Sequence, residues 1–150
     1  MKTPIVKYND KFLNAISWFM KVGGITLYPF IILREYYRDD SRYLAKGKIT
    51  LNHESIHIKQ QQEAIIASLI LFIGLNLVLS LVAWWLIPVM AYLSFYVWYI
   101  LEWFIKIFRY GSPNAAYRKI SFEQEAYGNQ DNTNYLKTRK NFSWMRFIFR

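Results

Sequence analysis

The sequence predicts a mainly α-helical integral membrane protein, built on a two-span helical hairpin with a small β element near its N-terminus. Residues 64–101 carry no charged side chain. The chain is 54% hydrophobic and 19% aromatic, which is more apolar than an average soluble domain. Of its 19 Lys and Arg residues, nine lie in residues 1–50 and nine in residues 106–150. Basic ends around an uncharged apolar centre are typical of a membrane protein with both ends in the cytoplasm. The length of 150 residues predicts one domain.

The distribution of the net charge of +9 indicates a lipid partner rather than a nucleic acid. Lys59 is the one cation between the two basic ends. Both termini are therefore expected in the cytoplasm, where their charges meet anionic headgroups. The first eleven residues lack the apolar core of a cleavable signal peptide, so none is expected.

The N-terminal third is predicted to contain a short helix followed by a strand. Residues 12–22 place apolar side chains at helical spacing and predict an amphipathic helix at the membrane interface. Residues 25–33 are rich in β-branched and aromatic residues and predict a strand, which Pro29 would confine to a sheet edge. A third membrane span over residues 12–33 is the alternative, and Lys21 counts against it.

A charged loop is expected over residues 34–48, with a second strand that ends at residues 49–51. Asn52 is expected to cap the N-terminus of the next helix. That helix should run through residues 53–63 without a breaker and continue into the apolar stretch.

Two apolar segments, residues 64–87 and 89–108, are predicted to form the membrane hairpin. At 1.5 Å per residue they are about 36 and 30 Å long as helices, enough to cross the hydrocarbon core. Pro88 separates them, and Trp84 and Trp85 lie at the turn, where aromatic belts are found. A re-entrant or half-buried pair is the alternative, because no polar loop separates the segments.

The residues after the hairpin are predicted to return to the side from which the chain entered, because the number of spans is even. Residues 114–128 predict a helix that ends at Gly128. Residues 129–141 are polar, and the last nine residues alternate aromatics with arginine and are expected at the headgroups.

The chemistry of the sequence centres on residues 53–57, which read HExxH. On a helix, His53 and His57 project from one face one turn apart, a spacing that two ligands of a tetrahedral Zn²⁺ ion need. The chain has no cysteine and only these two histidines, so any further protein ligand must be oxygen. Glu54 suits the general base that takes a proton from zinc-bound water.

A third protein ligand would leave the fourth coordination position of the zinc ion open for water, as in catalytic zinc sites. Glu123 and Glu125 are both candidates, and they lie on the same side of the predicted membrane as the histidines. Spacing alone does not choose between them.

These motifs resemble those of the gluzincin-type integral membrane zinc metallopeptidases, which include the HtpX heat-shock protease, the CAAX-prenyl endopeptidases and the β-lactam-sensor peptidase domains. Their pattern is HExxH, then membrane helices, then E-x-x-A-D. Residues 52–128 follow this pattern up to the last position, where Tyr127 stands in place of the aspartate that orients a zinc-binding histidine. The resemblance implies that Glu123 is the third ligand, that Glu125 is not, and that residues 25–33 form the edge strand on which the substrate lies.

Several other polar residues have both a functional and a structural interpretation. Tyr127, Tyr117 and Arg118 are candidates for stabilising the oxyanion of a tetrahedral intermediate, or the last two are headgroup anchors. Glu102 and Lys106 are explained by pairing one helical turn apart. Other candidates are a supporting role for Glu125 beside the metal ligands and a helix-packing role for Asn76.

The sequence thus predicts a zinc-dependent membrane endopeptidase that hydrolyses membrane or membrane-adjacent polypeptides, with its site at the cytoplasmic surface. The short chain leaves a homo-oligomer or a partner open. One alternative is an inactive zinc-binding regulator or scaffold. A bis-histidine haem protein is disfavoured, because His53 and His57 project from the same helix face and cannot bind opposite sides of one haem.

Overall fold

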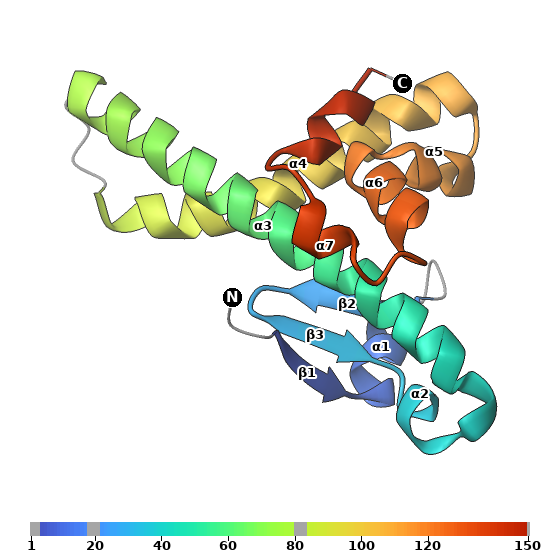
Figure 1. Ribbon diagram of the computed structural model, residues 1–150. Coiled ribbons are helices and arrows are strands. Elements are labelled where there is room, and N and C mark those ends of the chain that lie inside the picture. The colour runs from blue at the N-terminus through green and yellow to red at the C-terminus, as the bar shows by residue number, and fades with distance from the viewer. Residues whose placement is uncertain (1–3, 18–21, 80–83, 150) are drawn as a thin grey trace. The chain divides into compact units, whose positions relative to one another are not determined.

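The structure, a computed structural model, describes residues 4–17, 22–79 and 84–149. It is mainly helical, with a small three-stranded sheet and two long apolar helices (Figure 1). The chain divides into two compact units, Met1–Ile58 with Ala126–Arg139 and Lys59–Glu125 with Lys140–Arg150. We call these unit 1 and unit 2 and describe each by itself. The single functional domain expected for residues 1–150 stays a prediction.

The sheet of unit 1 contains β1 (Ile5–Tyr8), β2 (Gly24–Leu27) and β3 (Phe30–Leu33) in the order β1-β3-β2. β1 pairs with β3 in parallel, and β2 pairs with β3 antiparallel. The strand expected over residues 25–33 is therefore a hairpin, with Pro29 in the turn and β3 at the centre. The edge position expected from Pro29 is wrong for β3, because a proline in the turn removes no donor from the ladder. These strands also exclude a third membrane helix over residues 12–33.

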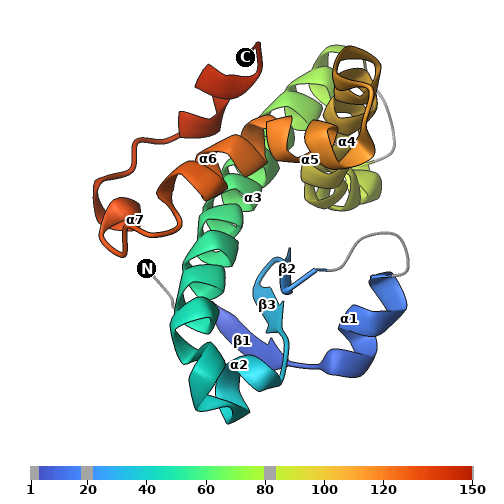
Figure 2. The same ribbon diagram turned by 90° about the vertical axis from the view of Figure 1, so that its right-hand side faces the viewer.

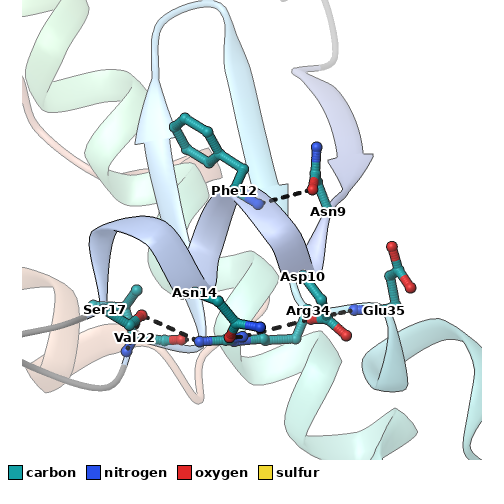
Figure 3. A network of polar contacts seen from close by, with 8 residues as sticks. All are labelled: Asn9, Asp10, Phe12, Asn14, Ser17, Val22, Arg34 and Glu35. Carbon is teal, nitrogen blue, oxygen red and sulfur yellow. Dashed lines mark hydrogen bonds and ion pairs between the residues drawn. The ribbon is translucent and has the colours of Figure 1, made fainter.

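Helix α1 (Asp10–Ile16) is shorter than the helix expected over residues 12–22, of which residues 18–21 lie outside the described part of the chain. Asn9 caps it, accepting a hydrogen bond from the Phe12 N–H. The Arg34 guanidinium then joins α1 to the start of β2. It donates to Asn14 Oδ1, to Ser17 Oγ at 3.1 Å and to the Val22 carbonyl at 3.1 Å (Figure 3).

The segment before the HExxH motif is helical, so the loop expected over residues 34–48 and the strand expected at residues 49–51 are both wrong. Helix α2 (Tyr36–Asp39) and a 3₁₀ turn (Ser41–Tyr43) lead directly into α3 (Leu44–Leu79). Asn52 is consequently inside α3 and does not cap it. Helical pairing of residues 44–51 satisfies the backbone groups that the expected cap would have served.

The core of unit 1 joins the sheet to the N-terminal half of α3. Ile31, Leu33 and Tyr37 pack with Ile58 of α3. A second cluster holds Ile56 of α3 against three residues of the later segment, which are Ala126, Tyr135 and Leu136. The sheet lies between α1 and this half of α3 (Figures 1 and 2).

In unit 2, a 3₁₀ turn (Trp84–Leu86) precedes helix α4 (Ile87–Tyr110). Pro88 does not interrupt a helix but lies in the first turn of α4, where its missing N–H costs no hydrogen bond. The first apolar helix is described to Leu79, residues 80–83 lie outside the described part of the chain, and residues 84–86 of the expected segment form the 3₁₀ turn. Gly111 ends α4 in the left-handed conformation (φ 66°).

The single helix expected over residues 114–128 is two helices, α5 (Pro113–Lys119) and α6 (Ser121–Asn129), so Gly128 does not end it. The break lies at Ile120, and the Glu102 carboxylate provides the reason. Its Oε1 accepts from the Ser121 N–H at 2.9 Å and its Oε2 from the Ser121 hydroxyl at 2.6 Å. This buried anion caps the N-terminus of α6.

The rest of unit 2 packs around a cluster of aromatic residues. Phe95 of α4 and Phe122 of α6 have ring centroids 4.4 Å apart, and Trp144 lies 4.6 Å from Phe122. Trp144 belongs to a 3₁₀ turn (Ser143–Phe147) and is buried, and its indole N–H donates to Glu63. The short helix α7 (Tyr135–Thr138) belongs to unit 1.

The apolar parts of α3 and α4 turn large side chains outward. Both helices are long and apolar enough to cross a membrane, judged by length and composition. They contact one another through Tyr96, whose hydroxyl donates to Gln61. Away from this contact, side chains such as Leu77 (65% exposed) and Phe108 (88% exposed) are accessible.

Candidate metal centre

The two histidines of the HExxH motif lie one turn apart on α3, as the sequence predicted. Nε2 of His53 and Nε2 of His57 are 3.1 Å apart, and both residues are buried. Two nitrogens that each bind a tetrahedral zinc ion at 2.0–2.1 Å lie about 3.4 Å apart. The histidine pair is therefore close to the separation that a zinc ion needs.

Glu123 is the third member of the group. Glu123 belongs to unit 2 and is buried, as are both histidines of unit 1. Two imidazoles and one carboxylate form a donor set that suits zinc and other first-row divalent metals. This buried group could hold a metal ion.

Within unit 2, the Glu123 carboxylate is held by a residue of α4 that the sequence did not single out. The Tyr99 hydroxyl donates to Glu123 Oε1 at 2.8 Å. The Tyr99 ring also stacks on Phe122, with an interplanar angle of 11°. No sequence signal distinguishes Tyr99, because it is one of 12 tyrosines and lies in an apolar segment.

Glu125, the other candidate for the third ligand, has a different partner. It is fully buried, and its Oε2 accepts from Gln60 Nε2 at 3.0 Å. The same amide nitrogen also donates to the Phe122 carbonyl. Glu125 thus holds α6 to the α3 turn that follows the HExxH motif.

Glu54 contacts the sheet of unit 1. Thr26 Oγ1 of β2 lies 2.7 Å from Glu54 Oε2, and both residues are buried. Gly24 of the same strand allows this close approach, because a Cβ there would lie 3.2 Å from Glu54 Cγ and 2.6 Å from Leu33 Cδ2. The sequence predicted a strand here and missed the threonine, because only pairing of the helix with the strand brings them together.

The His53 ring has two further neighbours in unit 1. Its Nδ1 lies 3.1 Å from Gln130 Oε1. The Tyr127 ring meets it edge to face, with centroids 4.7 Å apart. Tyr127, which stands where the resembling pattern has an aspartate, therefore meets His53 through its ring, while Gln130 provides a polar contact. Sequence reasoning did not single out Gln130, which lies in the polar segment after α6.

The two remaining candidates lie on α5 in unit 2. Tyr117 is partly buried, with its ring centroid 6.3 Å from that of Tyr99. Arg118 is exposed. Whether either residue contacts an oxyanion or a headgroup stays a prediction, as do the catalytic roles of the other residues.

The geometry supplies a buried nitrogen and carboxylate donor set, with a second carboxylate on the same helix as the two histidines. Such a set can hold a divalent metal ion and accept a proton next to it. In the comparisons with known proteins, no family model, curated protein or solved structure matches this chain.

Proposed function

We propose that this chain is a zinc-dependent membrane endopeptidase of the gluzincin type. The observation that carries the proposal is the pair of buried histidines one turn apart on the HExxH helix, with the buried Glu123 of α6 as the candidate third ligand. Zinc fits the donor set, because it takes imidazole nitrogen and carboxylate oxygen in four-coordinate sites. Three protein ligands leave one position open, which separates catalytic sites from structural ones.

Each residue of the proposed site has its own chemical role. His53, His57 and Glu123 would hold the ion, which would supply a Lewis acid for the activation of water at neutral pH. Glu54 accepts the proton from the attacking water and passes it to the leaving amine. Thr26 donates to Glu54 Oε2, which leaves Oε1 for the proton and fixes the side-chain rotamer.

The substrate and location follow from the two apolar helices. In this proposal the C-terminal part of α3 and α4 cross the bilayer as a hairpin, with both termini and the zinc site on the cytoplasmic side. The partners are then the lipid bilayer and a membrane or membrane-adjacent polypeptide. The charge pattern supports this orientation, because basic residues flank the apolar centre on both sides.

The test uses the full chain in detergent micelles or liposomes and compares wild type with Glu54→Gln. We expect one zinc ion per chain in both, and cleavage of an unfolded or membrane-anchored polypeptide by wild type alone. Loss of general-base catalysis should cost at least about 10²-fold in rate. The control is Glu35→Gln, which changes an exposed carboxylate and should keep full activity.

Wild type without stoichiometric zinc would rule out the proposal. Full activity in Glu54→Gln would rule out its mechanism. Tyr127, which stands where the resembling family has an aspartate, favours one alternative, an inactive zinc-binding regulator or scaffold. Zinc binding without cleavage of any polypeptide tested would support that alternative.

A further inference from the structure

The proposed function leaves unassigned the side chain of Gln130, which contacts His53 within unit 1. Gln130 Oε1 lies 3.1 Å from Nδ1 of His53, and Nε2 of the same ring faces His57. A neutral imidazole carries one proton, and an amide oxygen can only accept one. This contact therefore places the proton on Nδ1 and leaves the lone pair on Nε2, the nitrogen that faces the second histidine.

The backbone around Gln130 is held by the residue that precedes His53. Asn52 Nδ2 lies 2.6 Å from the Gln130 carbonyl oxygen, 3.2 Å from that of Asn132 and 3.4 Å from that of Asn129. The side-chain amide of Asn52 thus lies within hydrogen-bond distance of three backbone carbonyl oxygens at the end of α6 and just after it. Because Asn52 and His53 are adjacent, the Gln130 backbone and side chain are both held to the same turn of α3.

Tyr127 and Gln130 contact the His53 ring in different ways. The aromatic edge of Tyr127 limits rotation of the ring by packing against it, at an interplanar angle of 65°. A ring contact of this kind does not distinguish the two nitrogens. The hydrogen bond to Gln130 does distinguish them, because it engages Nδ1 and leaves Nε2 available as a ligand.

We propose that Gln130 is the positioning residue of His53, fixing the Nδ1–H tautomer so that Nε2 is presented to a divalent metal ion, and that Asn52 anchors Gln130 for this role. The inference rests on the proposed zinc site. Groups that hydrogen-bond the far nitrogen of a ligating histidine fix its orientation and raise its basicity, and their loss lowers metal affinity by about 10–100-fold.

The test has two readouts on the full chain in detergent micelles. The first is the ring ¹⁵N shifts of the metal-free protein at about pH 8.5, where histidine is neutral. The chain has two histidines, so a His57→Gln variant assigns the His53 signals. The second is zinc affinity by competition with a chelator.

Wild type should carry the His53 proton on Nδ1. Gln130→Met keeps the length of the side chain but lacks the amide oxygen, so it should mix the two tautomers and lower zinc affinity about 10–100-fold. Gln130→Glu restores an acceptor and should restore both readouts. Asn134→Ala, which removes an amide from the same segment whose Oδ1 accepts from Lys137, is the control and should change neither.

A wild-type His53 that carries its proton on Nε2 overturns the inference, whatever the zinc affinity. Unchanged zinc affinity in Gln130→Met overturns it as well. Wild type with the Nδ1 proton but without zinc binding contradicts the proposed function alone. In that case, loss of the Nδ1 proton in Gln130→Met still supports the positioning of His53 by Gln130.

Discussion

The two halves of helix α3 have opposite burial patterns. Between residues 53 and 63, the buried side chains are mostly polar, namely His53, Glu54, His57, Gln60, Gln61 and Glu63. Between residues 64 and 79, the large apolar side chains are mostly exposed, among them Ile66, Ile70, Leu71, Leu77 and Val78. Buried polar groups need hydrogen-bond partners, and apolar area that stays exposed to water contributes no hydrophobic stabilisation.

The difference teaches that the first half of α3 is stabilised by polar contacts with other parts of the protein, whereas the second half leaves its apolar side chains exposed. Each buried polar group of the first half meets a protein group, such as Thr26 for Glu54 or Glu125 for Gln60. The second half has an apolar outer surface that suits lipid. Helix α4 shows the same contrast, since Glu102 and Lys106 are buried while Phe108 is exposed.

The largest expected effect concerns Glu123 and Glu125, the two carboxylates that are candidates for the third metal ligand. Glu123→Ala removes a proposed ligand and should abolish stoichiometric zinc binding, a loss beyond the about 100-fold that supporting residues cost. Glu125→Ala removes the acceptor of Gln60 and should lower the free energy of unfolding by about 1–3 kcal/mol while zinc is retained. Metal analysis of the purified variants checks both. Loss of zinc in Glu125→Ala alone would reverse the ligand assignment.

The second prediction concerns the buried ion pair of α4. Lys106 Nζ lies 3.0 Å from Glu102 Oε1, and both side chains are almost inaccessible. Lys106→Met leaves the Glu102 charge buried without its cation, so it should lower the free energy of unfolding by about 3–5 kcal/mol. Denaturant titration in micelles measures this change.

The matched control for that pair is exposed. Arg38→Met breaks the pair with Asp39, whose side chain is 55% exposed, and should cost less than about 1 kcal/mol. Equal effects of Lys106→Met and Arg38→Met would show that burial of the Glu102–Lys106 pair does not raise the cost of breaking it.

The third prediction tests the apolar half of α3 directly. Leu77→Lys puts a charge near the centre of the predicted first span and should disfavour membrane insertion by about 2.5–3.5 kcal/mol. Gln62→Lys, in the polar half, should have little effect. The fraction of full-length chain that resists alkaline extraction from liposomes measures both. Equal insertion of the two lysine variants would argue against a membrane-spanning α3.

The smallest expected effect concerns the contact of the polar half with the sheet. Thr26→Val removes the hydroxyl that donates to Glu54, a hydrogen bond to a charged group that contributes about 1.5–3 kcal/mol. We expect peptidase activity to fall about tenfold or more, with zinc content unchanged. Thr50→Val, which removes a hydroxyl that donates to the Lys46 carbonyl of its own helix, is the control. Unchanged activity in Thr26→Val would show that Glu54 needs no support from β2.

Much of the fold could be predicted from local pattern. The spacing of His53 and His57, the two apolar helices and the glycine stop at Gly111 depend on helical periodicity and on terminal residues. Such signals lie within a few residues of the feature that they predict. Local pattern failed between residues 36 and 51, where charged side chains suggested a loop although the backbone is helical at every residue but Asp40.

The sequence by itself determined the ligand types, because a chain without cysteine and with two histidines offers nitrogen only at residues 53 and 57. It also determined that the centre of the chain is apolar. Only the tertiary structure decided that Thr26 contacts Glu54, that Tyr99 contacts Glu123 and that Gln130 contacts His53. The physical reason is that a hydrogen bond has a range of about 3 Å, while the residues that share it lie up to 77 positions apart in the chain.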